Sequence, residues 1–94
     1  MPILHSTLNR NSASWQKNSS DMSELLSEMN SLLEQAAEGG GEEAIERLRS
    51  KGKMPIRERI SHVLDSDSPF LEISPLAAWR SPFAISSGFL VGIG

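Results

Sequence analysis

The sequence predicts a mostly α-helical segment of two to three helices that leads into a β-strand. Between residues 21 and 38, apolar residues recur at intervals of three and four, which is the pattern of an amphipathic helix. Two shorter amphipathic stretches follow, and residues 88–94 form a short apolar run that is typical of a strand. A chain of 94 residues makes at most one small domain.

Residues 1–20 are expected to form a flexible N-terminal arm. The stretch is polar, is rich in Ser and Asn, and contains no acidic residue. Its cations are Arg10 and Lys17, with His5 beside them, which is too few for an organellar transit peptide. We expect a loosely ordered arm that is anchored by Trp15.

The first helix is predicted over residues 21–38. Ser20 or Asp21 would cap its first turn, with Glu24 completing a capping box. The three glycines at 39–41 would end it, since glycine adopts left-handed dihedrals without steric cost. Its apolar stripe is too large to be covered by so short a chain and implies a partner surface. The stripe consists of Met22, Leu25, Leu26, Met29, Leu32, Leu33 and Ala36.

Two shorter helices are predicted next, over residues 42–51 and from Pro55 to about Leu64. Glu43 and Arg47 are spaced for an ion pair on one helix face. In the later helix, Arg57, Glu58 and Arg59 should point outward. The apolar side chains expected to face inward there are Ile56, Ile60, Val63 and Leu64.

The remaining residues alternate between turns and extended segments. Residues 65–69 have the composition of a turn, residues 70–73 should be extended around Glu72, and residues 76–79 should form a helical turn. Residues 88–94 are the only convincing strand, and a strand without a mate is unusual in a folded domain. We therefore expect this chain to be the N-terminal part of a longer protein.

Composition excludes several kinds of site. The chain has no cysteine and two histidines far apart, so neither a disulfide framework nor a metal site is expected. No apolar run reaches the roughly 18–20 residues that span a bilayer, so no membrane association is expected. The Gly52-Lys53 pair lacks the spacing of a Walker motif.

Charge is segregated along the chain. Residues 21–46 hold eight acidic residues and no basic one, whereas residues 47–59 hold six basic residues and one acidic residue, Glu58. This division suits two solvated helix faces, or a basic half that meets a phosphate-bearing partner. Nucleic acid is not an expected partner, because the basic run is short and lacks interleaved aromatic residues.

Residues 39–78, GGGEEAIERLRSKGKMPIRERISHVLDSDSPFLEISPLAA, resemble the N-terminal segment of carboxyltransferase (beta) subunits of biotin-dependent acyl-CoA carboxylases. The stretch EISPLA at 72–77 is most similar to the methylcrotonyl-CoA or geranyl-CoA carboxylase type. Residues 88–94 look like the first strand of that family's crotonase-like (ClpP/crotonase) α/β domain, here cut off at Gly94. Leu48, Pro55 and the short lead-in at 79–87 depart from the family pattern.

The resemblance implies a division into a flexible arm (1–20), a helical extension (21–78), and the lead-in with the first strand of an incomplete crotonase-like domain (79–94). It implies carboxyl transfer from carboxybiotin to an acyl-CoA such as 3-methylcrotonyl-CoA. Backbone amides in oxyanion holes suit this chemistry, and the family's lie beyond Gly94. No catalytic residue, metal or bound cofactor is therefore expected in this chain, which should be structural and inactive alone.

The same resemblance implies partners and a location. Biotin would be carried by a separate biotin carboxylase/biotin carrier alpha subunit, and other beta subunits would complete the assembly. A bacterial cytoplasm is the expected location, or the mitochondrial matrix in a eukaryote.

Lys53 and Arg57, with Arg59 nearby, are the candidates for binding the phosphates of CoA, because they lie at the start of a predicted helix. Alternatively, Arg57 and Arg59 pair with Glu58, Asp65 or a neighbouring subunit. Two other functions stay open for the whole chain. One is a truncated stand-alone homologue that acts as a helical protein-interaction module. The other is a small basic-patch protein that binds RNA or anionic lipid.

Overall fold

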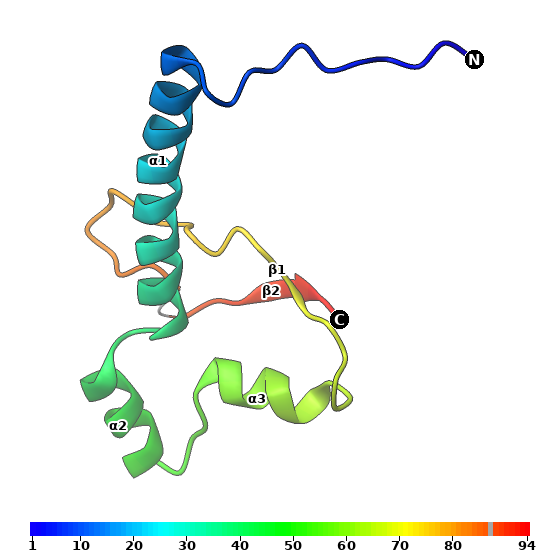
Figure 1. The fold of residues 1–94 in the computed structure, drawn as a ribbon. Coiled ribbons are helices and arrows are strands. Elements are labelled where there is room, and N and C mark those ends of the chain that lie inside the picture. Colours follow the sequence, from blue (N-terminus) through cyan, green and yellow to red (C-terminus); the bar gives the residue numbers. More distant parts are fainter. Residues whose placement is uncertain (87) are drawn as a thin grey trace. The chain divides into compact units, whose positions relative to one another are not determined.

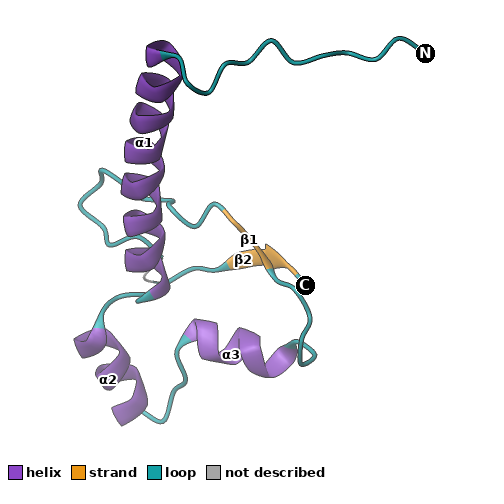
Figure 2. Ribbon diagram, in the orientation of Figure 1, coloured by secondary structure: helices purple, strands orange, loops and turns teal. Residues whose placement is uncertain are grey.

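The computed structural model describes residues 1–86 and 88–94. Three helices precede two short strands: α1 (Ala13–Ala37), α2 (Glu42–Ser50), α3 (Ile56–Val63), β1 (Leu71–Ile73) and β2 (Val91–Ile93) (Figures 1 and 2). The mostly helical character predicted from the sequence is confirmed. The chain divides into two compact units, Met1–Asn30 and Ser31–Gly94.

In the first unit, helix α1 begins at Ala13, so the helix start predicted at residue 21 is wrong. Ser12 supplies the cap, because its Oγ accepts a hydrogen bond from the backbone N–H of Trp15 at 3.2 Å. Residues 13–20 contain neither Gly nor Pro, so nothing interrupts the helix there. Lys17 and Asp21 form an ion pair of 2.7 Å across the predicted boundary. The arm expected over residues 1–20 is therefore helical from Ala13 onward.

Replacing Ser12 with alanine is expected to cost about 1 kcal/mol of helix stability, since the amide of Trp15 loses its acceptor. Amide hydrogen exchange in the first turn of α1 measures this loss. Ser20→Ala is the matched control, because Ser20 lies inside the helix and caps nothing. A larger loss of protection in Ser20→Ala than in Ser12→Ala would contradict the observed helix start.

In the second unit, glycines separate the helices as predicted. Gly39, with φ 66°, follows the end of α1, and Gly41, with φ 90°, precedes α2. Gly52, with φ 70°, follows α2, where the amide of Lys53 donates to the carbonyl of Leu48 at 2.9 Å. These are left-handed conformations that other residues rarely adopt. The predicted bounds of α2 and α3 are confirmed to within one residue.

The two strands pair with each other in antiparallel orientation, with Glu72 opposite Gly92. The expectation that the strand within residues 88–94 has no mate is therefore wrong. Its partner is the extended segment around Glu72, which is too short to be recognised as a strand from its own sequence. The strand is also shorter than predicted, covering Val91–Ile93.

Successive turns connect the strands, in place of the predicted helical turn at 76–79. The amide of Trp79 donates to the carbonyl of Leu76 at 3.0 Å, and the next turn closes from Ser81 to Ala78 at 3.0 Å. Positive φ values at Ser74, Ala78 and Arg80 prevent these turns from continuing as a helix. Ser87, the last residue of the lead-in, lies outside the described residues.

Few apolar side chains are buried. Among the described residues, Ala36 alone makes up the buried hydrophobic core. The strand register places four aliphatic side chains on one face of the sheet, and all four remain exposed: Leu71, Ile73, Val91 and Ile93. Val63, expected to face inward, is 80% exposed, so that expectation is wrong for this residue. The side chains of Ile56, Ile60 and Leu64 are half-buried.

The apolar stripe of α1 is exposed in the first unit, at Met22, Leu25, Leu26 and Met29. In the second unit, Leu32 and Leu33 of the predicted stripe are half-buried and Ala36 is buried, so the expectation of an uncovered stripe holds for its first four residues and not for the last three.

Candidate functional site

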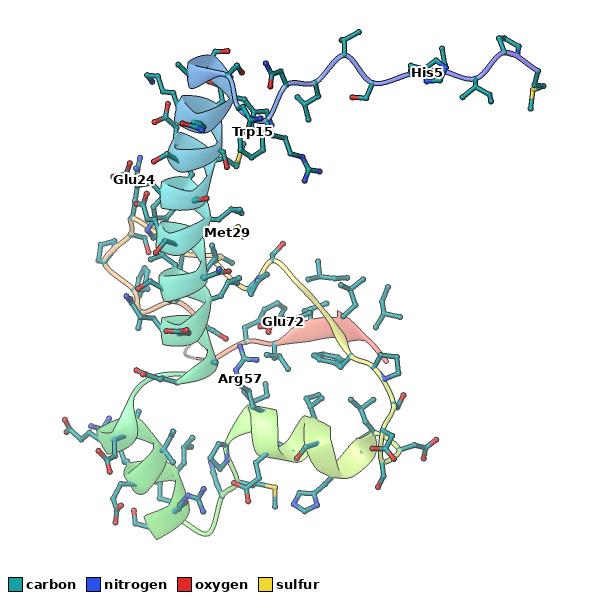
Figure 3. The ribbon with its side chains drawn as sticks, viewed as in Figure 1. His5, Trp15, Glu24, Met29, Arg57 and Glu72 are labelled. Carbon is teal, nitrogen blue, oxygen red and sulfur yellow. The ribbon has the colours of Figure 1, made fainter. Side chains whose placement is uncertain are left out.

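The most elaborate polar cluster of the second unit is centred on Arg57. Its guanidinium donates two hydrogen bonds to the Glu72 carboxylate, from Nη1 to Oε2 and from Nη2 to Oε1, each of 2.8 Å. Figure 3 shows the two side chains meeting between α3 and β1. Nη2 also donates to Ser86 Oγ at 2.8 Å and to the carbonyl of Ala36 at 3.2 Å. We call this set of contacts the Arg57 clamp.

The Arg57 clamp joins four segments that are distant in sequence: the end of α1, the first turn of α3, the middle of β1 and the loop at Ser86. The side chains of Arg57 and Glu72 are 29% and 20% exposed, so the pair is largely withdrawn from water. A bidentate geometry of this kind needs the planar fork of arginine. These hydrogen bonds connect β1 to α3 and to the end of α1.

The helix pattern predicted that Arg57 would point outward. This prediction is wrong, because its side chain is 29% exposed and is held by Glu72. The alternative prediction was that Arg57 pairs with Glu58 or Asp65. Arg57 does pair with a carboxylate, but the carboxylate belongs to Glu72. Glu58 instead pairs with Arg49 at 3.1 Å, on a more exposed surface. The predicted pair of Glu43 and Arg47 is confirmed, with a distance of 3.2 Å.

A groove beside α3 is lined by two cationic side chains, Lys53 and Arg59. Among residues 1–86 and 88–94, no ion pair involves Lys53 or Arg59. Both side chains line a groove of about 720 Å³, together with His62. The rest of the lining is largely apolar and is formed by Leu48, Gly52, Met54, Ile56, Val63 and Gly88. We call this feature the cationic groove.

A second hollow of about 440 Å³ adjoins the exposed face of the sheet. Ile73 and Val91 contribute to it from the strands, and Phe83 and Phe89 from the flanking loop. Because its lining is almost entirely apolar, this hollow suits packing against another apolar surface and offers no group for acid–base chemistry.

Metal binding and membrane crossing both lack a structural basis in residues 1–86 and 88–94. No group of three or more His, Asp or Glu side chains there is arranged to hold a metal ion. None of its helices combines the length and the apolar character needed to cross a membrane.

Comparison with known proteins then decides the family. No protein-family model matches the chain. A probable biotin-dependent acyl-coenzyme A carboxylase beta2 subunit of Mycobacterium tuberculosis is 42% identical over 92 residues, which cover 98% of this chain. Methylcrotonoyl-CoA carboxylase beta chains of Arabidopsis thaliana and, as a probable assignment, Drosophila melanogaster are 43% and 39% identical over 95 residues, again 98% of this chain.

The chain is homologous to one segment of biotin-dependent acyl-CoA carboxylase beta subunits. The family resemblance inferred from the sequence is thereby confirmed. The segment is short: it spans 17% of the mycobacterial relative and 16% of the plant and insect relatives. The names of the plant and insect relatives describe them as mitochondrial.

Within this beta-subunit segment, the candidates for CoA phosphate binding lie in different environments. Lys53 is exposed at the cationic groove, whereas Arg57 is held in its clamp by Glu72. Sequence reasoning missed Glu72 and Ser86 as partners of Arg57, and His62 as a residue of the groove. One signal for Glu72 was available, since a lone carboxylate between Leu71 and Ile73 in an apolar segment usually requires a cationic partner.

Proposed function

We propose that this chain forms the N-terminal helical segment of an acyl-CoA carboxylase carboxyltransferase subunit. The supporting observation is the similarity to beta subunits along 98% of the chain. The complete subunit would transfer a carboxyl group from carboxybiotin to an acyl-CoA such as 3-methylcrotonyl-CoA. The names of the plant and insect relatives favour this substrate.

The contribution of the chain itself would be structural. Carboxyl transfer requires stabilised negative charge on the thioester and biotin oxygens, which backbone amides provide well. We place those amides outside this chain. Residues 1–94 would instead supply the beginning of a crotonase-like α/β sheet, with the Arg57 clamp fixing β1 and the exposed aliphatic face meeting the rest of the domain. We propose that the arm ends before Ala13, that the helical extension runs from Ala13 to residue 78, and that residues 79–94 lead into the crotonase-like domain.

Assembly would involve two kinds of partner. A biotin carboxylase/biotin carrier alpha subunit would deliver biotin, and further beta subunits would complete the oligomer. The location would be a bacterial cytoplasm, or the mitochondrial matrix in a eukaryote. The words biotin-dependent in the name of the mycobacterial relative support the first partner.

Of the two residues that the sequence suggested for contact with CoA phosphates, Lys53 and Arg57, we propose this contact for Lys53. Exposure of Lys53 at the cationic groove supports its part in this proposal. For Arg57 a phosphate would have to compete with the two hydrogen bonds to Glu72, so a structural role is favoured there. Lower acyl-CoA affinity of the complete subunit in Lys53→Ala, with assembly intact, would support the contact.

The mass of the native protein that begins MPILHSTLN tests the main proposal. We expect top-down mass spectrometry to give a mass far above the 10.3 kDa of these residues. In a parallel assay, residues 1–94 alone should show no carboxyl transfer to 3-methylcrotonyl-CoA from carboxybiotin, while the complete subunit is active. A native mass of 10.3 kDa, or activity of the short chain alone, would contradict the proposal.

The second candidate is a stand-alone helical interaction module. The exposed stripe of α1, from Met22 to Met29, favours it, because an amphipathic helix with an open apolar face suits a partner's groove. A native mass equal to that of this chain would select this candidate. The chain would then be used to isolate its binding partner, and the stripe variant Leu25→Glu/Met29→Glu should no longer bind that partner.

A further inference from the structure

The uncovered part of the α1 stripe is a continuous apolar face on one side of the helix. It consists of Met22, Leu25, Leu26 and Met29, and we call it the open stripe. The last three residues lie three, four and seven positions after the first, which is the spacing of a single helix face. Their side chains are between 42% and 61% exposed. Apolar surface of this kind, aligned over two turns of a helix, is suited to a partner of matching shape.

The two edges of the open stripe differ in charge. With about 100° of rotation per residue, Asp21 and Glu28 lie along one edge, and Ser23 and Asn30 lie along the other. We call the first the acidic edge. Asp21 is neutralised by Lys17 at 2.7 Å, whereas no ion pair of the described residues involves Glu28. One carboxylate beside the open stripe is therefore left for a partner to neutralise.

The open stripe also has the spacing of a coiled-coil seam. Trp15, Met22 and Met29 are seven residues apart and take the first seam position of each heptad, and Leu25 takes the second. Figure 3 shows Trp15 and Met29 on one side of α1. In this register the acidic edge occupies the g positions, whose side chains reach across to the neighbouring helix. The pattern therefore favours a helix as the partner.

A second copy of α1 matches this seam poorly. In an antiparallel pair the two acidic edges would face each other, and like charges at such positions repel. In a parallel pair Glu28 would lie against Leu26 of the other helix, without a cation. Lys17 is the only basic residue in the sequence of α1 and already pairs with Asp21. The charge on the partner must therefore come from a different helix.

We propose that the open stripe of α1 pairs with an amphipathic helix of another protein, one that carries a row of Lys or Arg beside its apolar seam. Burial of the two seams supplies most of the attraction, and the basic row facing Glu28 selects the partner and its orientation. The opposite edge of the partner is uncharged, since it faces Ser23 and Asn30. This proposal rests on the second candidate function, in which α1 is an interaction module, and specifies the chemistry of the partner.

The test is a calorimetric and NMR titration of the protein with two designed helical peptides. Both have isoleucine and leucine at the seam positions. The basic probe carries lysine at its e and g positions, and the acidic probe carries glutamate there. A first variant, Leu25→Ser/Met29→Ser, removes apolar surface from the open stripe without changing its charge. We call it the polar variant.

Two further variants test the contribution of charge. Asp21→Lys/Glu28→Lys, the reversed variant, makes the acidic edge basic. Glu42→Lys/Glu46→Lys, the control variant, changes the net charge by the same amount at two exposed positions of α2. Neither Glu42 nor Glu46 takes part in an ion pair of the described residues. The control variant therefore measures any attraction that depends on net charge alone.

We expect saturable binding of the basic probe that shifts the methyl signals of Met22 and Met29. The basic probe should bind at least about tenfold more tightly than the acidic probe. The polar variant should lower this affinity at least about tenfold, because the buried seam is lost. The reversed variant should prefer the acidic probe, and the control variant should keep the original preference.

Three results would overturn the proposal. The first is the absence of saturable binding, and the second is equal affinity for the two probes or an equal effect of the reversed and control variants. The third is dimerisation of the protein in sedimentation equilibrium that disappears in the polar variant, since the open stripe would then bind a second copy.

The native mass separates these results from the second candidate function. If that mass is 10.3 kDa and the protein does not prefer the basic probe, the interaction module stands and the partner class is wrong. If the mass is far larger and the basic probe binds as expected, the stand-alone module fails while the partner class is supported.

Discussion

Replacing Arg57 with methionine is expected to lower the free energy of unfolding by about 2.5 kcal/mol, because the Glu72 carboxylate stays behind in a largely buried position without its partner. The carbonyl of Ala36 and the hydroxyl of Ser86 lose a donor at the same time. Methionine keeps most of the length and apolar contact of the arginine stem. Urea denaturation of the protein, followed by circular dichroism, measures the change.

Arg49→Met is the matched control for this substitution. Arg49 also pairs with a glutamate, at 3.1 Å, but its side chain is 60% exposed and that of Glu58 is 37% exposed. An exposed pair of this kind contributes less than about 1 kcal/mol. If Arg57→Met were no more damaging than Arg49→Met, the Arg57 clamp would not fix the sheet.

The double variant Arg57→Met/Glu72→Met separates the cost of the orphaned carboxylate from the value of the clamp. Removing both charges leaves no ion buried without a partner. We therefore expect the double variant to be more stable than Arg57→Met alone. If the loss of stability in the double variant equalled the sum of the losses in Arg57→Met and Glu72→Met, the two side chains would not act as a pair.

Gly92→Ala is expected to cost about 2 kcal/mol, because the face of β2 at this position has no room for a methyl group. A Cβ added at Gly92 would overlap the ring of Phe70 and would lie 2.6 Å from the carbonyl oxygen of Leu71. To remove these two overlaps, the ring of Phe70 must rotate away and the two strands must move apart. The same urea denaturation measures the loss.

Gly88→Ala provides the comparison, since a Cβ at Gly88 meets nothing within 4 Å. We expect its effect to stay within about 0.5 kcal/mol of zero. In a Phe70→Ala background the ring is absent, so adding Gly92→Ala should cost less than it does in the unaltered protein. Equal effects of Gly88→Ala and Gly92→Ala would contradict the observed pairing of β1 with β2.

The sequence predicted most accurately those features that depend on neighbouring residues. Both ends of α2 and the start of α3 follow from Gly41, Gly52 and Pro55, whose backbone preferences act over one or two positions. The ion pair of Glu43 and Arg47 follows from helix geometry in the same way. The family, too, was recognisable from the string of residues 39–78.

Features that depend on distant residues were not predictable by the same reasoning. Nothing local distinguishes Arg57 from Arg59, yet Arg57 is held by Glu72, 15 positions away, and by Ser86, 29 positions away. The short strand β1 is defined by its pairing with β2 and not by its own three residues. The start of α1 was misplaced for another reason, since Ser12 and Ser20 are both of a residue type that favours the N-cap position.

The long sequence separations in the Arg57 clamp also determine the order in which the chain can fold. Helices close contacts over three or four residues and form within about a microsecond. The sheet must bring Ile73 to Val91, so its formation waits for a much larger loop to close. During synthesis, at roughly 5–20 residues per second, α3 leaves the ribosome more than a second before β2 does. Arg57 therefore emerges before either of its side-chain partners, and the second unit becomes complete only when its last strand arrives.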